Sequence, residues 1–132
     1  MTLGVRAAAF DAKGRVLLVR HTYVDGWHLP GGGVERGETA IEAVAKELSE
    51  EGNIVLGAPP VLISIHLNRA ASAWDHVLFY RCDGVSQTAP KAPDREIAEA
   101  GFYALDALPA ETTPATRRRL AELDGGTPTP DW

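Results

Sequence analysis

The sequence predicts a single α/β domain, and three observations support this prediction. The chain has 132 residues, a length typical of one compact domain with one hydrophobic core. Short apolar runs bounded by Gly, Pro and Asp recur along it and are typical of β-strands. Two other segments open with signals that start helices. Strands and helices are therefore expected to share one core.

The first third of the chain is expected to be mostly extended. Leu3–Phe10 and Arg15–Arg20 are apolar runs that predict two strands. Asp11–Gly14 between them is typical of a tight turn, so the two strands are expected to form a hairpin. Trp27–Leu29 predicts a short extended segment that ends at a proline. The run Gly31–Gly33 that follows is not expected inside a helix or a strand.

A helix is predicted over Ala40–Glu51. Thr39-Ala-Ile-Glu42 has the pattern of a capping box, in which the threonine caps the helix and the glutamate reaches back. Gly52-Asn53 is a signal for the helix end. The apolar positions at helical spacing, which define the expected buried face, are Ile41, Val44, Ala45 and Leu48.

The remaining chain predicts four more strands and one more helix. A helix is expected from Thr113-Pro114 to about Leu123, because proline is favoured at the first helical position. Residues 1–126 are expected to form the domain and Thr127–Trp132 a mobile tail. Asp83–Asp94 is expected to be a loop. The expected strands are Ile54–Leu56, Val61–Leu67, His76–Cys82 and Phe102–Leu105.

Charge and cysteine content exclude some classes of function. The net charge of -5 argues against a nucleic-acid duplex as partner, since duplex-binding proteins neutralise phosphates with a basic face. An acidic protein can still bind an anionic substrate through a bound cation. The single cysteine, Cys82, lies in an apolar run, is expected to be buried and inert, and forms no internal disulfide. No signal peptide or membrane-spanning run is apparent, so a cytoplasmic location is expected.

A carboxylate cluster on the predicted helix breaks two rules of helix stability. Glu47, Glu50 and Glu51 fall within an arc of roughly 100° on the helix surface, where they repel one another. They also lie near the C-terminal end, where the helix dipole disfavours negative charge. A solvated acidic face is one interpretation. A hard divalent cation that accepts oxygen ligands is the other.

A longer pattern surrounds these glutamates. Five residues separate Gly32 from Glu38, seven more precede Lys46-Glu-Leu-Ser-Glu-Glu51, and Ile54 closes the pattern. This resembles the Nudix box: Gly, five residues, Glu, seven residues, Arg-Glu, an aliphatic residue, any residue, Glu-Glu, any residue, Gly and a final aliphatic residue. The match covers 23 positions, about a sixth of the chain. The resemblance implies an α/β/α sandwich with a mixed β-sheet between helices.

Two positions depart from the family pattern. Lys46 stands where the family has arginine, so the positive charge is kept but the rigid guanidinium fork is lost. Lys46 is four residues from Glu50 and is expected to neutralise part of the cluster. Asn53 stands where the family has glycine at the helix end, and asparagine is the next-best residue for a left-handed cap. Neither departure removes a metal ligand.

The resemblance implies the following roles. Mg²⁺, or Mn²⁺, would be held by Glu47, Glu50 and Glu51 with the carbonyl of Gly32, and Glu38 would be structural. The general base varies in this family. Here it would be Glu50 or Glu47, or a glutamate on a later loop, for which the candidates are Glu96, which we favour, and Glu99. A solvated loop acid is the other interpretation of Glu96.

Substrate contacts are less clearly marked. Arg20 and Arg6, with Arg69 as a further candidate, have the side chain best suited to bind a phosphate, although a lone arginine is usually just solvated. Trp27 is suited to stack on a base, but a core position is the favoured interpretation. The histidines show no zinc spacing. The loops expected to select the substrate are Thr22–Trp27, Asn68–Asp75 and Asp83–Asp94.

The function expected from the resemblance is a metal-dependent pyrophosphohydrolase. It would cleave the diphosphate linkage of a nucleoside diphosphate derivative or a nucleoside triphosphate, as a monomer or homodimer. One alternative is a Nudix-like domain that binds a nucleotide without cleaving it, to which Lys46 points. Another is an acidic protein-interaction domain, which would leave the glycine run and the spacing unexplained.

Overall fold

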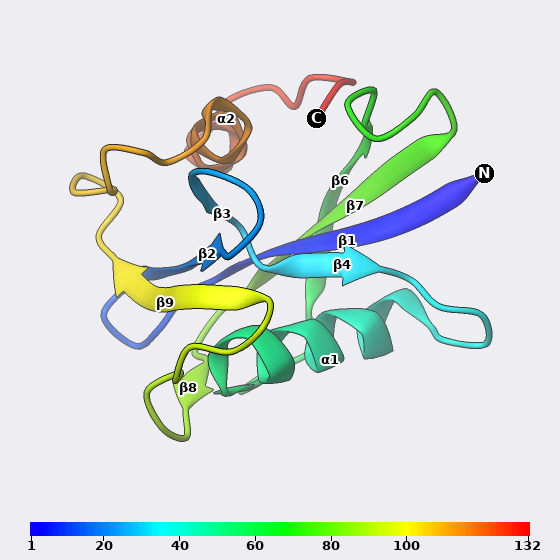
Figure 1. Ribbon diagram of the computed structural model, residues 1–132. Helices are drawn as coiled ribbons and strands as arrows, with labels where there is room; N and C mark the ends of the chain where they lie inside the picture. Colours follow the sequence, from blue (N-terminus) through cyan, green and yellow to red (C-terminus); the bar gives the residue numbers. More distant parts are fainter.

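A computed structural model describes residues 1–132 of the chain. Nine strands and two helices follow one another along it (Figure 1). In chain order these are β1 (Thr2–Ala9), β2 (Val16–His21), β3 (Trp27–His28), β4 (Gly31–Gly33), α1 (Ala40–Gly52), β5 (Ile54–Val55), β6 (Val61–Leu67), β7 (Asp75–Cys82), β8 (Ser86–Gln87), β9 (Ile97–Tyr103) and α2 (Pro114–Leu123).

The strands form a mixed sheet and two smaller ones. The largest has the order β4-β1-β7-β6, in which β1 and β7 are parallel and the other neighbours antiparallel. A second sheet has the order β3-β2-β9, and β5 pairs with β8. Helix α1 lies below the large sheet and α2 above it in Figure 1. The predicted α/β fold, with a mixed sheet between helices, is confirmed.

Strand β1 separates the two hydrophobic clusters of the core. Its side chains alternate between faces, so Val5 and Ala7 pack toward α1 while Ala8 packs toward α2. A strand covered on both faces is apolar almost throughout, which explains the run of small and apolar residues in this part of the sequence.

The predicted hairpin between the first two strands is wrong. The turn forms, with Gly14 at φ 73°, but the only ladder contact between the two strands is the bridge from Phe10 to Val16. Both long edges of β1 are already occupied by β4 and β7. Strand β2 therefore leaves β1 and pairs with β3 and β9 instead.

The glycine run Gly31–Gly33, which was not expected in a strand, forms β4. Gly4 and Val5 of β1 face Gly33 and Gly32 across this ladder. A Cβ atom on Gly31 would collide with the backbone carbonyl oxygen of Val5. Glycine is used here because another backbone approaches closely, which is a known reason for glycine in strands.

The predicted helix α1 has both expected caps. Thr39 and Glu42 form the capping box, and Asn53 caps the C-terminal end in a left-handed conformation with φ 57°. The predicted buried face is partly wrong, because Ile41 is 50% exposed. The buried positions are Ala43, Val44, Leu48, Glu51 and Gly52, since only this sector of the helix meets the sheet.

The last third of the chain differs from the sequence prediction in three places. Strand β8 lies inside the segment expected to be a loop, and β9 begins at Ile97 instead of Phe102 because the whole segment pairs with β2. The tail, which was expected to be mobile, is packed against the domain. Pro130 and Trp132 exchange backbone hydrogen bonds with Leu67, and the Trp132 ring lies near Phe79.

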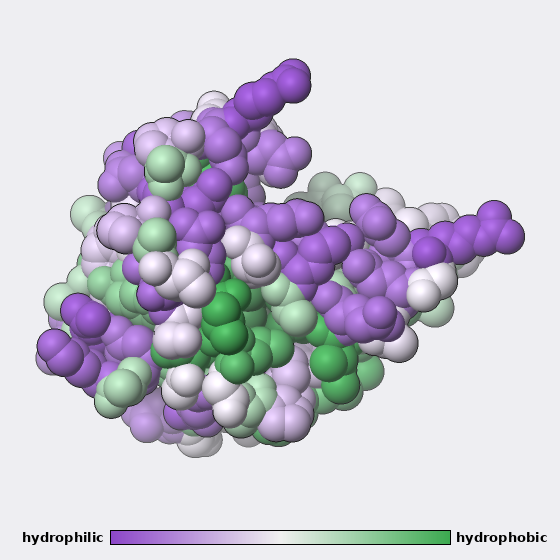
Figure 2. Space-filling view, turned by 90° about the horizontal axis from the view of Figure 1, so that it is seen from below, coloured by the Kyte–Doolittle hydropathy of each residue, from purple (hydrophilic) through white to green (hydrophobic).

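The surface on the α1 side carries apolar side chains between hydrophilic ones (Figure 2). Several exposed apolar residues belong to β6, where Val61 and Ile65 are 57% and 55% exposed. Neither helix has the length and apolar character that a membrane span requires.

Candidate metal and substrate site

Glu51 is the most buried of the three glutamates that the sequence singled out. It is 6% exposed, and its Oε1 accepts a hydrogen bond of 2.9 Å from the backbone N–H of Gly31. The pKa of Glu51 is raised to about 7, mainly by burial and also by the Glu47 carboxylate, while the Gly31 hydrogen bond and Arg6 oppose the shift. A buried carboxylate with one hydrogen bond is therefore held at the junction of α1 and β4.

Glu47 lies against the backbone of β4. A Cβ atom on Gly32 would stand 2.6 Å from Oε1 of Glu47, so the glycine leaves the space that this carboxylate occupies. Burial raises the pKa of Glu47, and the neighbouring charge of Glu50 raises it as well. The carboxylates of Glu51 and Glu47 thus lie against the adjacent glycines Gly31 and Gly32 of strand β4.

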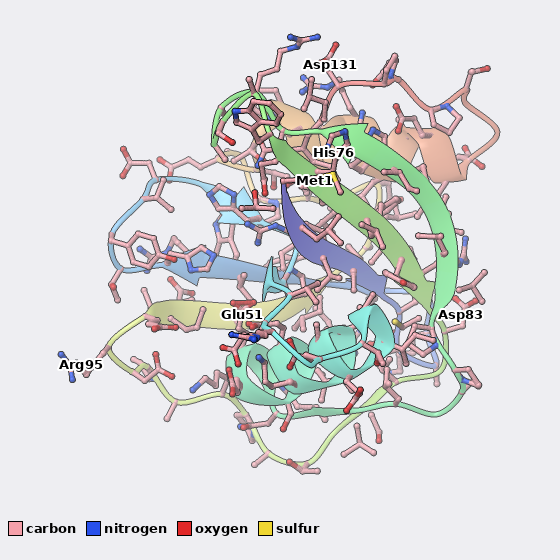
Figure 3. The ribbon with its side chains drawn as sticks, turned by 90° about the vertical axis from the view of Figure 1, so that its right-hand side faces the viewer. Met1, Glu51, His76, Asp83, Arg95 and Asp131 are labelled. Carbon is pink, nitrogen blue, oxygen red and sulfur yellow. The ribbon has the colours of Figure 1, made fainter.

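Glu50 is exposed and lines a cleft of about 400 Å³ with Glu51. The opposite wall is the loop before β9, which contributes Asp94, Arg95 and Glu96. Figure 3 shows Glu51 between α1 and β9, and Arg95 at the tip of this loop, pointing outward. The structure therefore brings Glu96 and the α1 carboxylates, which are far apart in sequence, to one cleft.

The donor set fits a hard divalent cation. Glu51 is buried and Glu47 half-buried, the pKa values of both carboxyl groups are raised, and neither forms an ion pair within the chain. Oxygen ligands of this kind suit Mg²⁺. No three acidic, histidine or cysteine side chains already surround a common point, so Glu50 would have to turn toward the other two.

Lys46 contacts the loop before α1 and not Glu50. Its Nζ lies 2.9 Å from Oε2 of Glu38 and 3.6 Å from Oε1 of Glu35. The hydrogen bond from Lys46 holds the pKa of Glu38 below its usual value. Lys46 was expected to neutralise part of the carboxylate cluster by contact with Glu50. Its only effect on the cluster is the field of its charge, which lowers the pKa of Glu47.

The two candidate arginines, Arg6 and Arg20, differ in their contacts. Arg6 donates a hydrogen bond of 3.0 Å from Nη1 to the carbonyl of Leu29, and its charge favours ionised Glu47 and Glu51. Arg20 forms an ion pair of 2.7 Å with Glu99. Arg6 is thus the arginine that acts on the carboxylate cluster.

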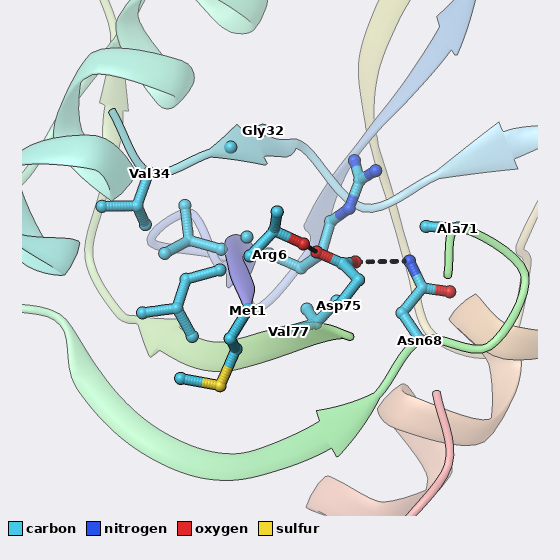
Figure 4. A pocket seen from close by; sticks show the side chains of 13 residues that line it. Met1, Arg6, Gly32, Val34, Asn68, Ala71, Asp75 and Val77 are labelled. Atoms are coloured by element: carbon cyan, nitrogen blue, oxygen red, sulfur yellow. Dashed lines mark hydrogen bonds between the residues drawn. The ribbon is translucent and has the colours of Figure 1, made fainter. Parts of the chain in front are cut away.

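A pocket of about 600 Å³ adjoins this cluster (Figure 4). Arg6 and Gly32 belong to its wall, and the far side carries Asn68 and Asp75, which are joined by a 3.2 Å hydrogen bond. The expected substrate loop Asn68–Asp75 therefore lines the same pocket as the glycine strand.

Trp27 is a core residue, which was the favoured interpretation of the sequence. It is 8% exposed, and its ring centroid lies 5.2 Å from that of Tyr103. The ring is packed inside the protein, so the substrate-stacking role considered for Trp27 has no support here.

The two loop candidates for the general base, Glu96 and Glu99, differ in the contacts of their carboxylates. The carboxylate of Glu99 is engaged by Arg20. The carboxylate of Glu96 forms no hydrogen bond or ion pair within the chain and faces the cleft with Glu50 and Glu51. Of the two, Glu96 is the one whose carboxylate is free to act.

A histidine pair beside the loop after β2 was missed by the sequence analysis. The rings of His21 and His28 lie 5.5 Å apart, and Tyr23 lies 5.2 Å from His21. The pKa of His21 is lowered to about 4, mainly by burial and also by the charges of His28 and Arg6. His21 and Tyr23 line a hollow of about 460 Å³ with Glu111. Their sequence spacing gave no signal, because the turn of this loop brings them together.

Comparisons with known proteins agree with this geometry. The NUDIX domain family model matches residues 1–123. The chain is 35% identical to 8-oxo-dGDP phosphatase NUDT18 of Mus musculus over 97 residues, which cover 74% of this chain and 29% of that protein. It is 30% identical to the Homo sapiens protein of the same name, over 90% of this chain and 37% of that protein. The chain thus spans about a third of the length of these relatives.

A solved structure shows the same fold over almost the whole chain. The MutT NUDIX hydrolase of Burkholderia pseudomallei superposes with a TM-score of 0.76 and 29% identity, covering 92% of this chain and 97% of that one. A UDP-X diphosphatase superposes with a TM-score of 0.63 and 25% identity, covering 98% of this chain and 66% of that one.

Proposed function

The chain belongs to the Nudix family, and from that premise we propose that it is a metal-dependent pyrophosphohydrolase. Its substrate is a nucleoside diphosphate derivative or a nucleoside triphosphate, and the diphosphate linkage is the bond that breaks. The observation that carries this proposal is the hydrogen bond from Gly31 to buried Glu51, beside Glu47 on Gly32. These contacts hold two carboxylates that have no ion-pair partner against one glycine strand.

The metal is Mg²⁺ or Mn²⁺, and the residues that would hold it are Glu47, Glu50 and Glu51 with the carbonyl of Gly32. When bound, the cation would lower the pKa of a water molecule and offset charge on the leaving phosphate. The raised pKa values of Glu47 and Glu51 support this assignment, because a cation would relieve the cost of their ionisation.

Glu96 is the general base that we favour. Its free carboxylate lies across the cleft from Glu50 and Glu51 and would accept the proton of the attacking water. The water oxygen then forms a bond to one phosphorus, the bridging P–O bond breaks, and the other phosphate leaves with the electron pair. Glu50 and Glu47 remain alternative bases for this step.

Arg6, the pocket that it lines and the hollow at His21 would bind the rest of the substrate. A guanidinium is suited to bind phosphate oxygens, and Arg6 already lies in the field of Glu47 and Glu51. The hollow at His21 and Tyr23 offers aromatic rings to a base. The name of the NUDT18 relatives makes 8-oxo-dGDP the first compound to test.

A nucleotide sensor that does not cleave its ligand is the alternative. Lys46 is the feature that favours it, because its bonds go to Glu35 and Glu38 and leave the ligand carboxylates without a direct cationic brace. All the acids required for metal binding are nevertheless present.

A panel assay tests the proposal. The protein is incubated with Mg²⁺ or Mn²⁺ and a set of nucleoside diphosphates, triphosphates and diphosphate-linked derivatives, including 8-oxo-dGDP, and the products are identified. Glu50→Gln and Glu51→Gln should each lower turnover at least about a hundredfold without unfolding the protein. Glu42→Gln, a change of the same kind on the same helix, should leave turnover unaltered, since glutamine also closes a capping box.

The outcomes separate the two functions. Release of a nucleoside monophosphate that depends on metal supports the hydrolase. A nucleotide that raises the melting temperature but stays intact over hours with metal supports the sensor. Full activity of both Glu50→Gln and Glu51→Gln would reject the assigned site.

A further inference from the structure

The loop before β9 carries two acidic residues whose surroundings differ. Asp94 and Glu96 both line the cleft with Glu50 and Glu51. The Glu96 carboxylate has no partner within the chain, whereas both oxygens of the Asp94 carboxylate are engaged. The two acids of this loop therefore differ: the Asp94 carboxylate is held by bonds within the chain, and the Glu96 carboxylate is free to contact a substrate.

The contacts of Asp94 are directed at the backbone around Glu96. Its Oδ1 accepts hydrogen bonds from the N–H groups of Glu96, at 2.9 Å, and Ile97, at 2.7 Å. Its own N–H donates to the carbonyl of Ile97 at 2.9 Å. The second oxygen, Oδ2, accepts from Nζ of Lys91 at 2.6 Å, and this lysine side chain is only 12% exposed. Asp94 thus closes a tight turn on the N-terminal side of Glu96.

Thr22 holds the same segment from the other side. Its backbone N–H donates to the carbonyl of Glu96 at 2.9 Å, and its hydroxyl donates to the carbonyl of Arg95 at 2.7 Å. Both backbone polar groups of Glu96 are therefore bonded, one to Asp94 and one to Thr22. The main chain is fixed while the carboxylate is left free, which is the arrangement that a precisely placed catalytic group requires.

We propose that Asp94 is a positioning residue that holds the carboxylate of Glu96 opposite the carboxylates of α1. The inference rests on the proposed function, in which Glu96 is the base. Asp94 does not touch the reacting atoms; it acts through the turn, and Lys91 keeps its carboxylate in place. A small displacement of a catalytic group costs a large factor in rate, so this turn sets the turnover number.

Two substitutions of Asp94 separate positioning from simple stability. Asp94→Ala removes the three hydrogen bonds that the Asp94 side chain accepts. Asp94→Asn keeps an oxygen that accepts from Glu96 and Ile97, but it loses the negative charge and the second oxygen, which accepts from Lys91. Asp94→Ala should lower kcat at least about tenfold with KM changed less than about twofold, and Asp94→Asn should stay within about threefold of the wild type.

A double-mutant cycle and amide exchange test the link to Glu96. Glu96→Gln should lower kcat by about a hundredfold, and adding Asp94→Ala to it should cause no further loss, because the two residues act as one unit. The amides of Glu96 and Ile97 should exchange at least about ten times faster in Asp94→Ala and keep wild-type rates in Asp94→Asn. Asp11→Ala is the control, since Asp11 also accepts from two backbone N–H groups and a cationic side chain in a turn, but lies outside the cleft.

Each result decides the proposal. Wild-type kcat in Asp94→Ala, unchanged exchange of the two amides, or losses that multiply in the double variant would each overturn it. If Asp94→Ala does not fold, the Asp94→Asn and Thr22→Val variants still test the proposal. Thr22→Val removes the hydrogen bond from the Thr22 hydroxyl to the Arg95 carbonyl and should lower kcat about threefold or more. A wild-type protein that cleaves nothing in the panel rejects the proposed function and this inference together. An active wild type whose Glu96→Gln variant is fully active rejects this inference alone.

Discussion

The backbone N–H of Gly31 donates a hydrogen bond of 2.9 Å to Oε1 of Glu51 and so joins strand β4 to helix α1. The bond draws a carboxylate into a position that is 6% exposed. Neighbouring Gly32 acts differently: because it has no side chain, it leaves room for the Glu47 carboxylate. The glycine run therefore shapes the acidic site directly, by a hydrogen bond and by the space that it leaves.

The first prediction concerns pH in the absence of metal. The folded pKa of Glu51, about 7, exceeds its unfolded value, so between about pH 4.5 and 7 the folded state holds a proton that the unfolded state has lost. Stability should therefore fall as pH rises through this window, by up to about 3 kcal/mol. Urea unfolding with chelator at pH 5 and pH 8 measures it.

Glu51→Gln provides the comparison for this measurement. The amide cannot ionise, and its oxygen can still accept from Gly31. The stability of the variant should therefore not fall between pH 5 and pH 8, and the variant should be more stable than wild type at pH 8. Adding Mg²⁺ should stabilise the wild type at pH 8 and have little effect on the variant. Identical pH dependence of the two proteins would contradict the burial that we describe for Glu51.

The second prediction uses three consecutive glycines. Gly31→Ala should destabilise the protein strongly, because the new Cβ collides with the backbone of Val5. Gly32→Ala should fold but bind metal more weakly, because the new Cβ meets the flexible Glu47 carboxylate at 2.6 Å. Gly33→Ala should be neutral, since no atom lies within 4 Å of its Cβ position. Thermal unfolding and calorimetric titration with Mn²⁺ measure the two effects, and equal behaviour of all three variants would refute this explanation.

The third prediction compares Arg6 with Arg20. Arg6→Ala should lower kcat/KM by about tenfold or more, because a phosphate contact and a charge near the carboxylates are lost. It should also raise the pKa of Glu51, which the Arg6 charge now lowers, so the acidic limb of the pH–rate profile should move to higher pH. Arg20→Ala should change kcat/KM less than about threefold, since Arg20 is paired with Glu99. A larger effect at Arg20 would reverse the assignment.

The fourth prediction concerns the packed tail. Arg119 is fully buried and donates hydrogen bonds to Glu122 at 3.0 Å, to Thr129 at 2.7 Å and to the Asp131 carbonyl at 3.0 Å. Arg119→Ala leaves the Glu122 carboxylate uncompensated and should lower the melting temperature by about 10 °C or more. Arg117→Ala, on the exposed face of the same helix and bonded to the Pro109 carbonyl rather than to the tail, should lower it by no more than about 2 °C. Similar losses in the two variants would show that the tail is not held by Arg119.

The local parts of the molecule were predictable from sequence. Helix α1 and its caps follow from Thr39, Glu42 and Asn53, which act within one or two turns of the chain. The acidic residues of the site were found for the same reason, because their spacing along a helix fixes which face they share. Strand β4 was not predicted, since the reason for its glycines is the backbone of Val5, a residue far away in sequence.

The sequence by itself determined both helices, most of the longer strands, the fold class and the acidic cluster on one helix. Only the tertiary structure decided that β2 pairs away from β1, that Glu51 is buried against Gly31, and that Arg6 rather than Arg20 acts on the cluster. It also brought Glu96, anchored by Asp94 and Thr22, to the cleft. The physical reason is the range of the interactions: capping and helical periodicity act between near neighbours, whereas burial, ion pairing and strand edges depend on segments that meet only in the folded chain.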